Sequence, residues 1–121
     1  MLDTNVIIWF RSGSPLLSKV ARDTLLAGKD PIFVSVASGW EYEQKRRLRP
    51  HELTLTFIEV CAEIPHEPLD LAFDVHRFAA TLPMIHRDPF DRMLIAQAIH
   101  HDLTLIASDE HIRQYPVRTL W

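Results

Sequence analysis

The chain has 121 residues, which is the usual size of one domain, and carries a net charge of −3. Its 47% hydrophobic and 24% charged residues form the ordinary balance of a globular protein and argue against a disordered or fibrous chain. The three glycines form no glycine-rich phosphate-binding loop, and the single Cys61 excludes an intrachain disulfide and a cysteine-based metal cluster. We therefore expect one domain over residues 1–121.

We expect neither a transmembrane helix nor a signal peptide in this chain. No run approaches the roughly 18 apolar residues that a transmembrane helix needs. The first residues, Met1-Leu2-Asp3, reach a carboxylate without a basic segment, which is unlike a signal peptide. We expect a cytoplasmic protein in a reducing environment, with no membrane partner.

The first half of the chain alternates short apolar runs with amphipathic segments. We predict a strand at Met1–Asp3, a helical turn or two at 6–10, a helix at 16–27 and a second strand at 32–34. Two more helices follow, one from Ser35 or Ser38 to the basic run before Pro50 and one at 51–61.

The second half continues the alternation. We predict a strand at 64–69, helices at 70–80 and 89–101, and a strand at 103–107. A helical turn at 109–114 and a last strand at 117–120 complete the chain. Strands separated by helices predict an α/β fold of three layers (α/β/α), whose central, mainly parallel five-stranded sheet has helices on both faces.

Acidic residues follow the strands of this expected sheet or open its helices. Asp3 ends the first strand, Glu41 lies one turn into the helix after 32–34, Asp91 opens the helix at 89–101, and Asp109 follows the strand at 103–107. Each has a plain alternative as a helix-capping residue: Ser38 and Glu41 fit a capping box, and Asp88-Pro89 fits an N-cap followed by proline.

Taken together, these acids favour a metal site over capping. Strand carboxyl ends and the helices after them share one edge of a parallel sheet, where ligand sites form. Two carboxylates about 5 Å apart repel by about 3 kcal/mol at an effective dielectric near 20, so some must be protonated or a cation must bind among them. Oxygen donors favour Mg²⁺ or Mn²⁺, which can activate water against a phosphodiester.

The same motifs resemble the PIN-domain family, and within it the VapC-type toxins of toxin–antitoxin pairs. The resemblance rests on Leu2-Asp3-Thr4-Asn5, Trp40-Glu41 with Lys45, the segment from His86 to Arg92, Leu94–Ala98, and the strand leading to Asp109. It implies an endoribonuclease that depends on Mg²⁺, with Mn²⁺ as a substitute, in which water attacks phosphorus in line and leaves a 5′-phosphate and a 3′-hydroxyl.

The resemblance also implies roles for single residues. The acidic quartet would be Asp3, Glu41, Asp91 and Asp109, with Asp3 and Asp91 binding the metal directly and the other two binding it through water. Supporting residues would be Thr4, Asn5 and Asp88, and the candidates for RNA contact are Lys45, Arg46 and Arg92. The implied partners are RNA, a cognate antitoxin and a second copy of the chain.

The negative net charge argues against binding nucleic acid through a general basic field. Local charge differs, because the run from Lys45 to Arg49 holds four cations in five residues. The run suits a solvated helix end, where cations favour the dipole, or an RNA-contacting surface. Lys45, four residues after Glu41, suits a helix ion pair equally well.

Three positions depart from the family pattern. Only Met1 and Leu2 precede the first acid, so we expect a shortened central strand, through either a truncated sequence or a late start codon. Ala107 replaces the threonine usual two positions before the fourth acid, so a hydroxyl contact is lost or shifted. Arg49 replaces a glycine after the basic helix.

Two other functions remain open. A haloacid-dehalogenase-like phosphatase also carries an acid after its first strand, but Asn5 stands where that family has a second aspartate. An inactive PIN-like binding module would fit Ala107 and the short first strand. For His86, beside the acids, a structural role is favoured over metal binding, and the aromatic residues are expected mainly in the core.

Overall fold

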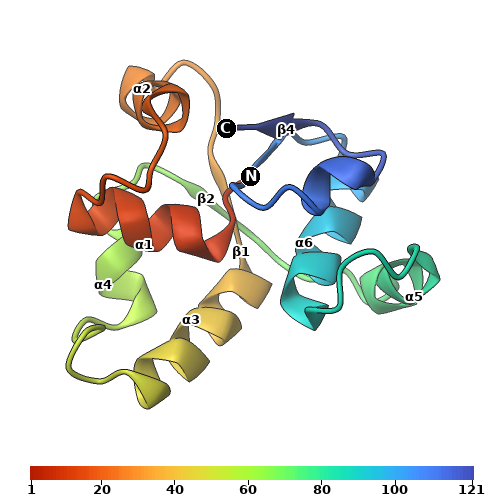
Figure 1. Ribbon diagram of the computed structural model, residues 1–121, viewed down its shortest axis with the longest axis horizontal. Coiled ribbons are helices and arrows are strands. Elements are labelled where there is room, and N and C mark those ends of the chain that lie inside the picture. Colours follow the sequence, from red (N-terminus) through yellow and green to blue (C-terminus); the bar gives the residue numbers. More distant parts are fainter.

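The computed structural model describes residues 1–121 and has helices on both sides of parallel strands (Figure 1). The strands are β1 (Phe33–Ser35), β2 (Glu67–Leu69), β3 (Leu105–Ile106) and β4 (Thr119–Leu120). The helices are α1 (Thr4–Ser12), α2 (Lys19–Ala27), α3 (Val36–Leu48), α4 (Phe57–Cys61), α5 (Val75–Thr81) and α6 (Pro89–His100), with a 3₁₀ turn at Ile112–Gln114.

The first residues of the chain join two pairs of strands. β1 pairs with β2 and β3 with β4, all in parallel, and Leu2 forms single-residue parallel bridges to Val34 and to Ile106. The Leu2 N–H donates to the Phe33 carbonyl at 3.0 Å, and the Ile106 N–H donates to the Met1 carbonyl at 2.9 Å.

The expected five-stranded sheet is therefore only partly correct. The parallel α/β arrangement is confirmed, but the structure has two two-stranded pieces, and Leu2 alone takes the position between them. α1 begins at Thr4, so the chain leaves the sheet directly after Asp3.

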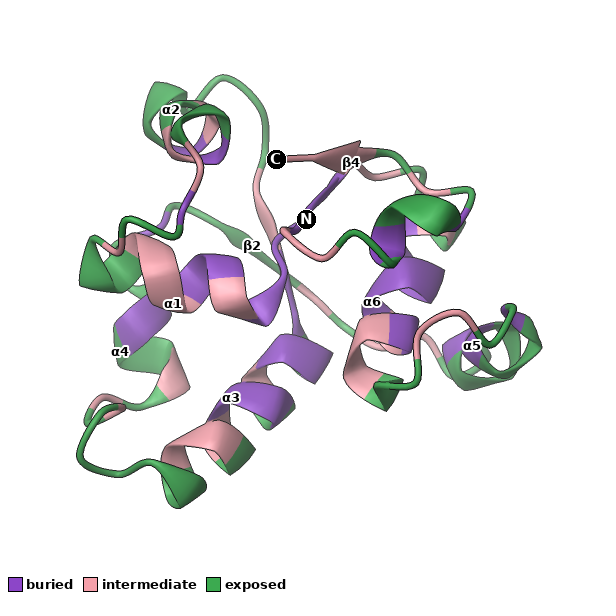
Figure 2. Ribbon diagram, in the orientation of Figure 1, coloured by how far each residue is buried: buried purple, intermediate pink, exposed green.

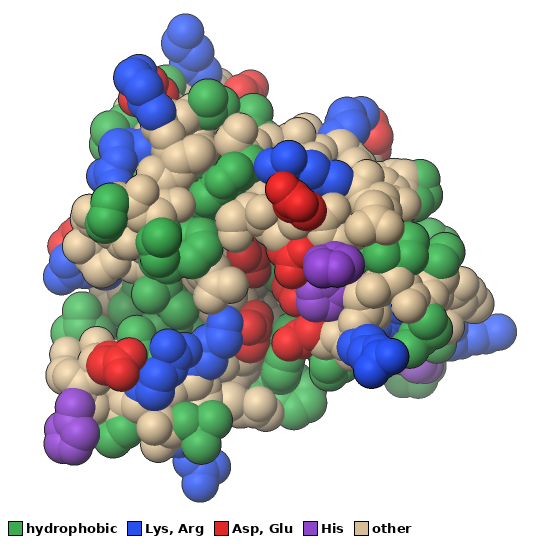
Figure 3. Space-filling view, viewed as in Figure 1, with side chains coloured by type: hydrophobic (Ala, Val, Ile, Leu, Met, Phe, Trp, Pro, Cys, Tyr) green, Lys and Arg blue, Asp and Glu red, His purple; other side chains and the backbone are tan.

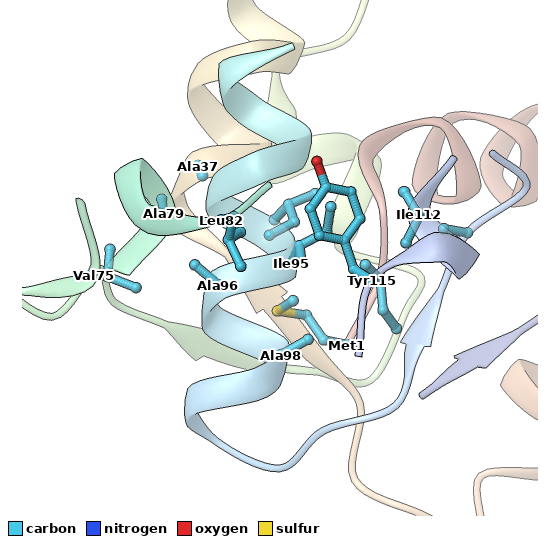
Figure 4. Packing of buried hydrophobic residues seen from close by; sticks show 13 residues of the cluster. Met1, Ala37, Val75, Ala79, Leu82, Ile95, Ala96, Ala98, Ile112 and Tyr115 are labelled. Carbon is cyan, nitrogen blue, oxygen red and sulfur yellow. The ribbon is translucent and has the colours of Figure 1, made fainter. Parts of the chain in front are cut away.

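Side-chain alternation along these segments fills a core on each face of the sheet. Leu2, Val34 and Ile106 contribute to one cluster with α1, α2 and α4. The residues next to them in the chain face the other way, and Met1, Leu105 and Ala107 belong to the second cluster, which α5 and α6 cover. Figure 4 shows Ile95 and Ala98 of α6 beside Met1 in this second core.

Local caps decide where two of the helices begin. α3 begins after Ser35, one of the two predicted starts, and the Ser35 hydroxyl accepts from the Ala37 N–H at 3.0 Å, so the alternative capping box at Ser38 is wrong. The predicted helix at 51–61 is reduced to α4, because Thr56 and Glu59 form a capping box that starts it late. The helix predicted at 70–80 is also shorter, as α5, and the strands other than β1 are shorter than predicted.

The basic helix ends without a glycine. Arg49 follows α3 with φ −131°, a negative value that does not require glycine. None of the helices combines the length and the apolar character that crossing a membrane requires.

Leu2 should make a large contribution to stability. It is fully buried between the two pairs of strands, so Leu2→Ala is expected to lower the free energy of unfolding by about 2–5 kcal/mol. Urea unfolding measures this, with Leu16→Ala as the control because Leu16 is 64% exposed. Equal effects of the two substitutions would contradict this role of Leu2.

Candidate functional site

The first acid, Asp3, lies directly after the central bridge. Its backbone N–H donates to the Ile106 carbonyl at 3.0 Å, and α1 begins at the next residue. Although Asp3 has the N-cap position of α1, its side chain forms no capping hydrogen bond, and the residue is only 4% exposed. The capping hydrogen bond considered for Asp3 is therefore not formed.

Burial of this carboxyl group has a direct electrostatic consequence. Loss of solvent, together with the nearby charges of Asp91 and Glu41, raises the pKa of Asp3 to about 7. The charge of Lys45 and the backbone N–H of Asn5 oppose the rise. These interactions place three acids from different segments of the chain in one electrostatic cluster.

Glu41 is held by residues on both sides. It lies buried on α3, and Oε2 accepts from the Thr4 hydroxyl at 2.5 Å, while Oε1 pairs with Lys45 Nζ at 2.6 Å. Lys45 also donates to Asn5 Oδ1 at 3.0 Å. The expected support from Thr4 and Asn5 is thus directed to Glu41 and Lys45, and the expected ion pair of Glu41 with Lys45 is present.

The start of α6 supplies the next acids. Asp88 is the N-cap: its Oδ1 accepts from the Phe90 N–H at 2.8 Å, and Pro89 follows at the first helical position. Asp91 lies in the first turn, where its pKa is raised to about 6, mainly by burial and also by the charges of Asp88, Glu41 and Asp109. His86 opposes that rise.

Asp109 is held in the cluster by two histidines, His86 and His111. His86 Nε2 lies 3.0 Å from Asp109 Oδ2 and 3.1 Å from Asp91 Oδ2. The His111 N–H donates to Asp109 Oδ1 at 2.7 Å. Burial acts to raise the pKa of Asp109, but hydrogen bonds from His111 and His86 outweigh it and hold the pKa below its ordinary value.

The sequence interpretation placed His86 beside the acids but missed His111. His111 was not considered, although it stands two residues after Asp109, a spacing at which a side-chain carboxylate commonly accepts the backbone N–H of a turn. His86 Nε2, Asp91 and Asp109 each bring one potential ligand atom within 4.8 Å of the others.

Arg92 does not have the role that we predicted for it. The residue is 8% exposed, and its guanidinium donates to the carbonyls of Ala79 and Leu82 at 2.8 Å and of Pro83 at 2.7 Å. It therefore ties the end of α5 and the following loop to α6 rather than facing RNA. Arg46 lies at the surface of α3 and pairs with Glu43 at 2.7 Å.

The acidic side chains line a depression on one face of the molecule. Figure 3 shows them gathered near the middle of the view, with histidines along one margin and basic side chains along the opposite one. The first turn of α1 nearby is mostly buried (Figure 2). Carboxylate oxygens from Asp3, Glu41, Asp91 and Asp109 are the donor set that a hard divalent cation prefers, so these residues fit such an ion.

Comparison with known proteins identifies the fold. The family model of the PIN domain matches residues 1–117. The structure is similar to a chain in the crystal structure of VapBC2 from Rickettsia felis bound to a DNA fragment from their promoter, with a TM-score of 0.65 and 16% sequence identity over 99% of this chain and 96% of that one. No match is found among curated protein sequences.

Removal of Arg92 should destabilise the fold. Arg92→Met leaves three carbonyl acceptors without their charged donor, so the free energy of unfolding is expected to fall by about 4.5 kcal/mol or more, at about 1.5–3 kcal/mol for each such hydrogen bond. Urea unfolding measures the loss, with Arg113→Met as control because Arg113 is exposed. An unfolding curve for Arg92→Met that matches the control would show that these contacts contribute little.

The raised pKa of Asp3 predicts how stability depends on pH in metal-free protein. The folded state retains the Asp3 proton more tightly than the unfolded chain, so this contribution is present below the ordinary pKa, near 3.8, and is lost as pH rises towards 7. Asp3→Asn cannot ionise, so the free energy of unfolding of this variant relative to the original chain should increase over that interval. Urea unfolding with a chelator present tests this, and a difference independent of pH would contradict it.

Proposed function

The chain belongs to the PIN-domain family, and from this premise we propose that it is a metal-dependent endoribonuclease acting as the toxin of a VapC-type toxin–antitoxin pair. The observation that carries the proposal is the meeting of Asp3, Glu41, Asp91 and Asp109 from separate segments of the chain. The pKa values of Asp3 and Asp91, raised to about 7 and about 6, indicate an excess of buried negative charge that a cation would relieve.

Asp3 and Asp91 are the proposed direct ligands of Mg²⁺, with Mn²⁺ as a substitute, and Glu41 and Asp109 are proposed to act through water. A divalent ion bound by such oxygen donors supplies activated water and stabilises the negative charge that develops on a phosphodiester. Thr4 and Lys45 fix the orientation of Glu41, and His86 contacts Asp91 and Asp109, so the chain itself keeps the donor oxygens directed to one place.

The basic end of α3 is the proposed RNA-contacting surface. Lys45 and Arg46 form ion pairs with Glu41 and Glu43, whereas Arg47 is exposed, so the run presents positive charge beside the acidic depression. With a net charge of −3, RNA binding should be modest and sensitive to salt. Arg92 is omitted from this surface because its guanidinium is buried.

A protein partner is also part of the proposal. An apolar groove between α3 and α4 includes Val36, Trp40 and Ile58, of which Ile58 is 83% exposed, and exposed apolar surface of this kind is typical of interaction sites. The similar VapBC2 structure is a complex of two proteins. We expect a cognate antitoxin and a second copy of the chain as partners; light scattering and co-purification with the product of the neighbouring reading frame would detect them.

The central test is cleavage of RNA by the purified chain. With Mg²⁺ present, we expect endonucleolytic cleavage that a chelator abolishes and that Asp91→Asn reduces by at least about 100-fold, because loss of a metal ligand removes the charge that holds the ion. The matched control is Asp74→Asn, since Asp74 is exposed and its side chain caps no helix.

Other outcomes identify the alternatives. Binding of an antitoxin peptide without cleavage of any RNA would favour an inactive PIN-like binding module. Release of phosphate from small esters would favour a phosphatase, although Asn5 accepts a hydrogen bond from Lys45 where that chemistry needs a second acid. Cleavage that persists with the chelator or in Asp91→Asn would contradict the proposed mechanism.

A further inference from the structure

Asp109 differs from the other acids of the site in how it is held. Its side chain is 39% exposed, against 18% for Asp91 and 10% for Glu41. The two residues before it, Ala107 and Ser108, donate no side-chain hydrogen bond to it. An exposed carboxylate beside other acids would turn towards solvent unless other groups restrain it, because like charges repel.

Two imidazole rings provide that restraint, one at each carboxylate oxygen. His86 Nε2 lies 3.0 Å from Oδ2, and His111 Nδ1 lies 2.9 Å from Oδ1. The rings stand edge to face with centroids 5.9 Å apart. His86 Nε2 also lies 3.1 Å from Asp91 Oδ2, so this ring connects the start of α6 to the end of β3.

The backbone around His86 determines which of its nitrogens carries the hydrogen. The Asp88 N–H donates to His86 Nδ1 at 3.1 Å, so Nδ1 must offer a lone pair. In a neutral imidazole the other nitrogen is then protonated. His86 therefore presents an Nε2–H to the acids rather than a lone pair, and that nitrogen is a donor to carboxylates and not a metal ligand.

We infer that His86 and His111 are positioning residues that clamp Asp109 between two imidazole N–H groups and keep it beside Asp91. This inference rests on the proposed function, because the clamp matters only if these acids act together on a metal ion. It leaves the metal an all-oxygen donor set, although His86 lies among the acids. The backbone N–H of Asp88 then contributes to the site by fixing the tautomer of His86.

The first experiment measures binding of Mn²⁺ to three variants by calorimetry, with thermal unfolding as a check on folding. His86→Leu removes the donor and should weaken Mn²⁺ binding by about 10–100-fold, the usual effect of losing a group that orients a ligand. His86→Gln keeps an N–H donor and should restore most of the affinity. His101→Leu is the control, since His101 is exposed and follows the far end of α6.

Two results of that experiment would overturn the inference. Mn²⁺ binding in His86→Leu equal to that of the original chain would show that the clamp has no effect. Affinity in His86→Gln as low as in His86→Leu would show that a donor is insufficient and that the imidazole has another task, such as binding the metal itself.

The second experiment needs no metal and therefore separates this inference from the proposed function. Nitrogen NMR of the metal-free protein, with the ring neutral, should show His86 protonated at Nε2 and unprotonated at Nδ1, and Asp109→Asn should shift the Nε2–H signal. The opposite tautomer, or a signal unaffected by Asp109→Asn, would overturn the clamp. Should the protein bind no Mn²⁺ and cleave no RNA, the proposed function fails, while this spectrum still decides the role of His86.

Discussion

The structure depends on one unfavourable interaction, the repulsion among carboxyl groups that the fold brings together in a shielded place. Asp3 is buried between the central strands and the first turn of α1, so solvent screens the charge of its carboxylate poorly. Two carboxylates about 5 Å apart would repel by about 3 kcal/mol even at an effective dielectric near 20. Such an arrangement is stable when protons, N–H donors or a cation balance the charge, and the site provides the first two through raised pKa values, Lys45 and the histidines.

The apolar cores keep the acids together despite that repulsion. Leu2 and its alternating neighbours contribute to the clusters on both faces of the sheet, so Asp3 cannot move away without disturbing each of them. On the other side, Arg92 ties the loop before α6 to the end of α5 and thereby fixes the segment that carries His86 and Asp91. Stability and site geometry are in this way consequences of the same packing.

The sequence was sufficient for the features that depend on local pattern. The helix at 89–101, its Asp88-Pro89 start and the apolar runs around residues 33 and 105 were predictable, because capping chemistry and hydrophobic periodicity act over a few residues. The convergence of the acids also followed, since parallel strands bring their carboxyl ends to one edge.

What could not be predicted depends on contacts between distant residues. The hydrogen bond of Thr4 to Glu41 spans 37 positions, and that of His86 to Asp109 spans 23. The sequence around Arg92 is the same whether its guanidinium faces RNA or three buried carbonyls. The fold of the surrounding loop decides between the two. Leu2 alone forms bridges where we predicted a strand, because the length of strand pairing depends on the neighbouring strands as well as on the local sequence.

The most direct measurement of the central claim is calorimetric titration of the purified chain with Mg²⁺ near neutral pH, repeated in buffers that differ in ionisation enthalpy. If a divalent ion relieves the repulsion among these acids, Mg²⁺ should bind and release protons, because Asp3 and Asp91 are partly protonated near their pKa values of about 7 and about 6. Absence of binding, or binding without proton release, would contradict the account.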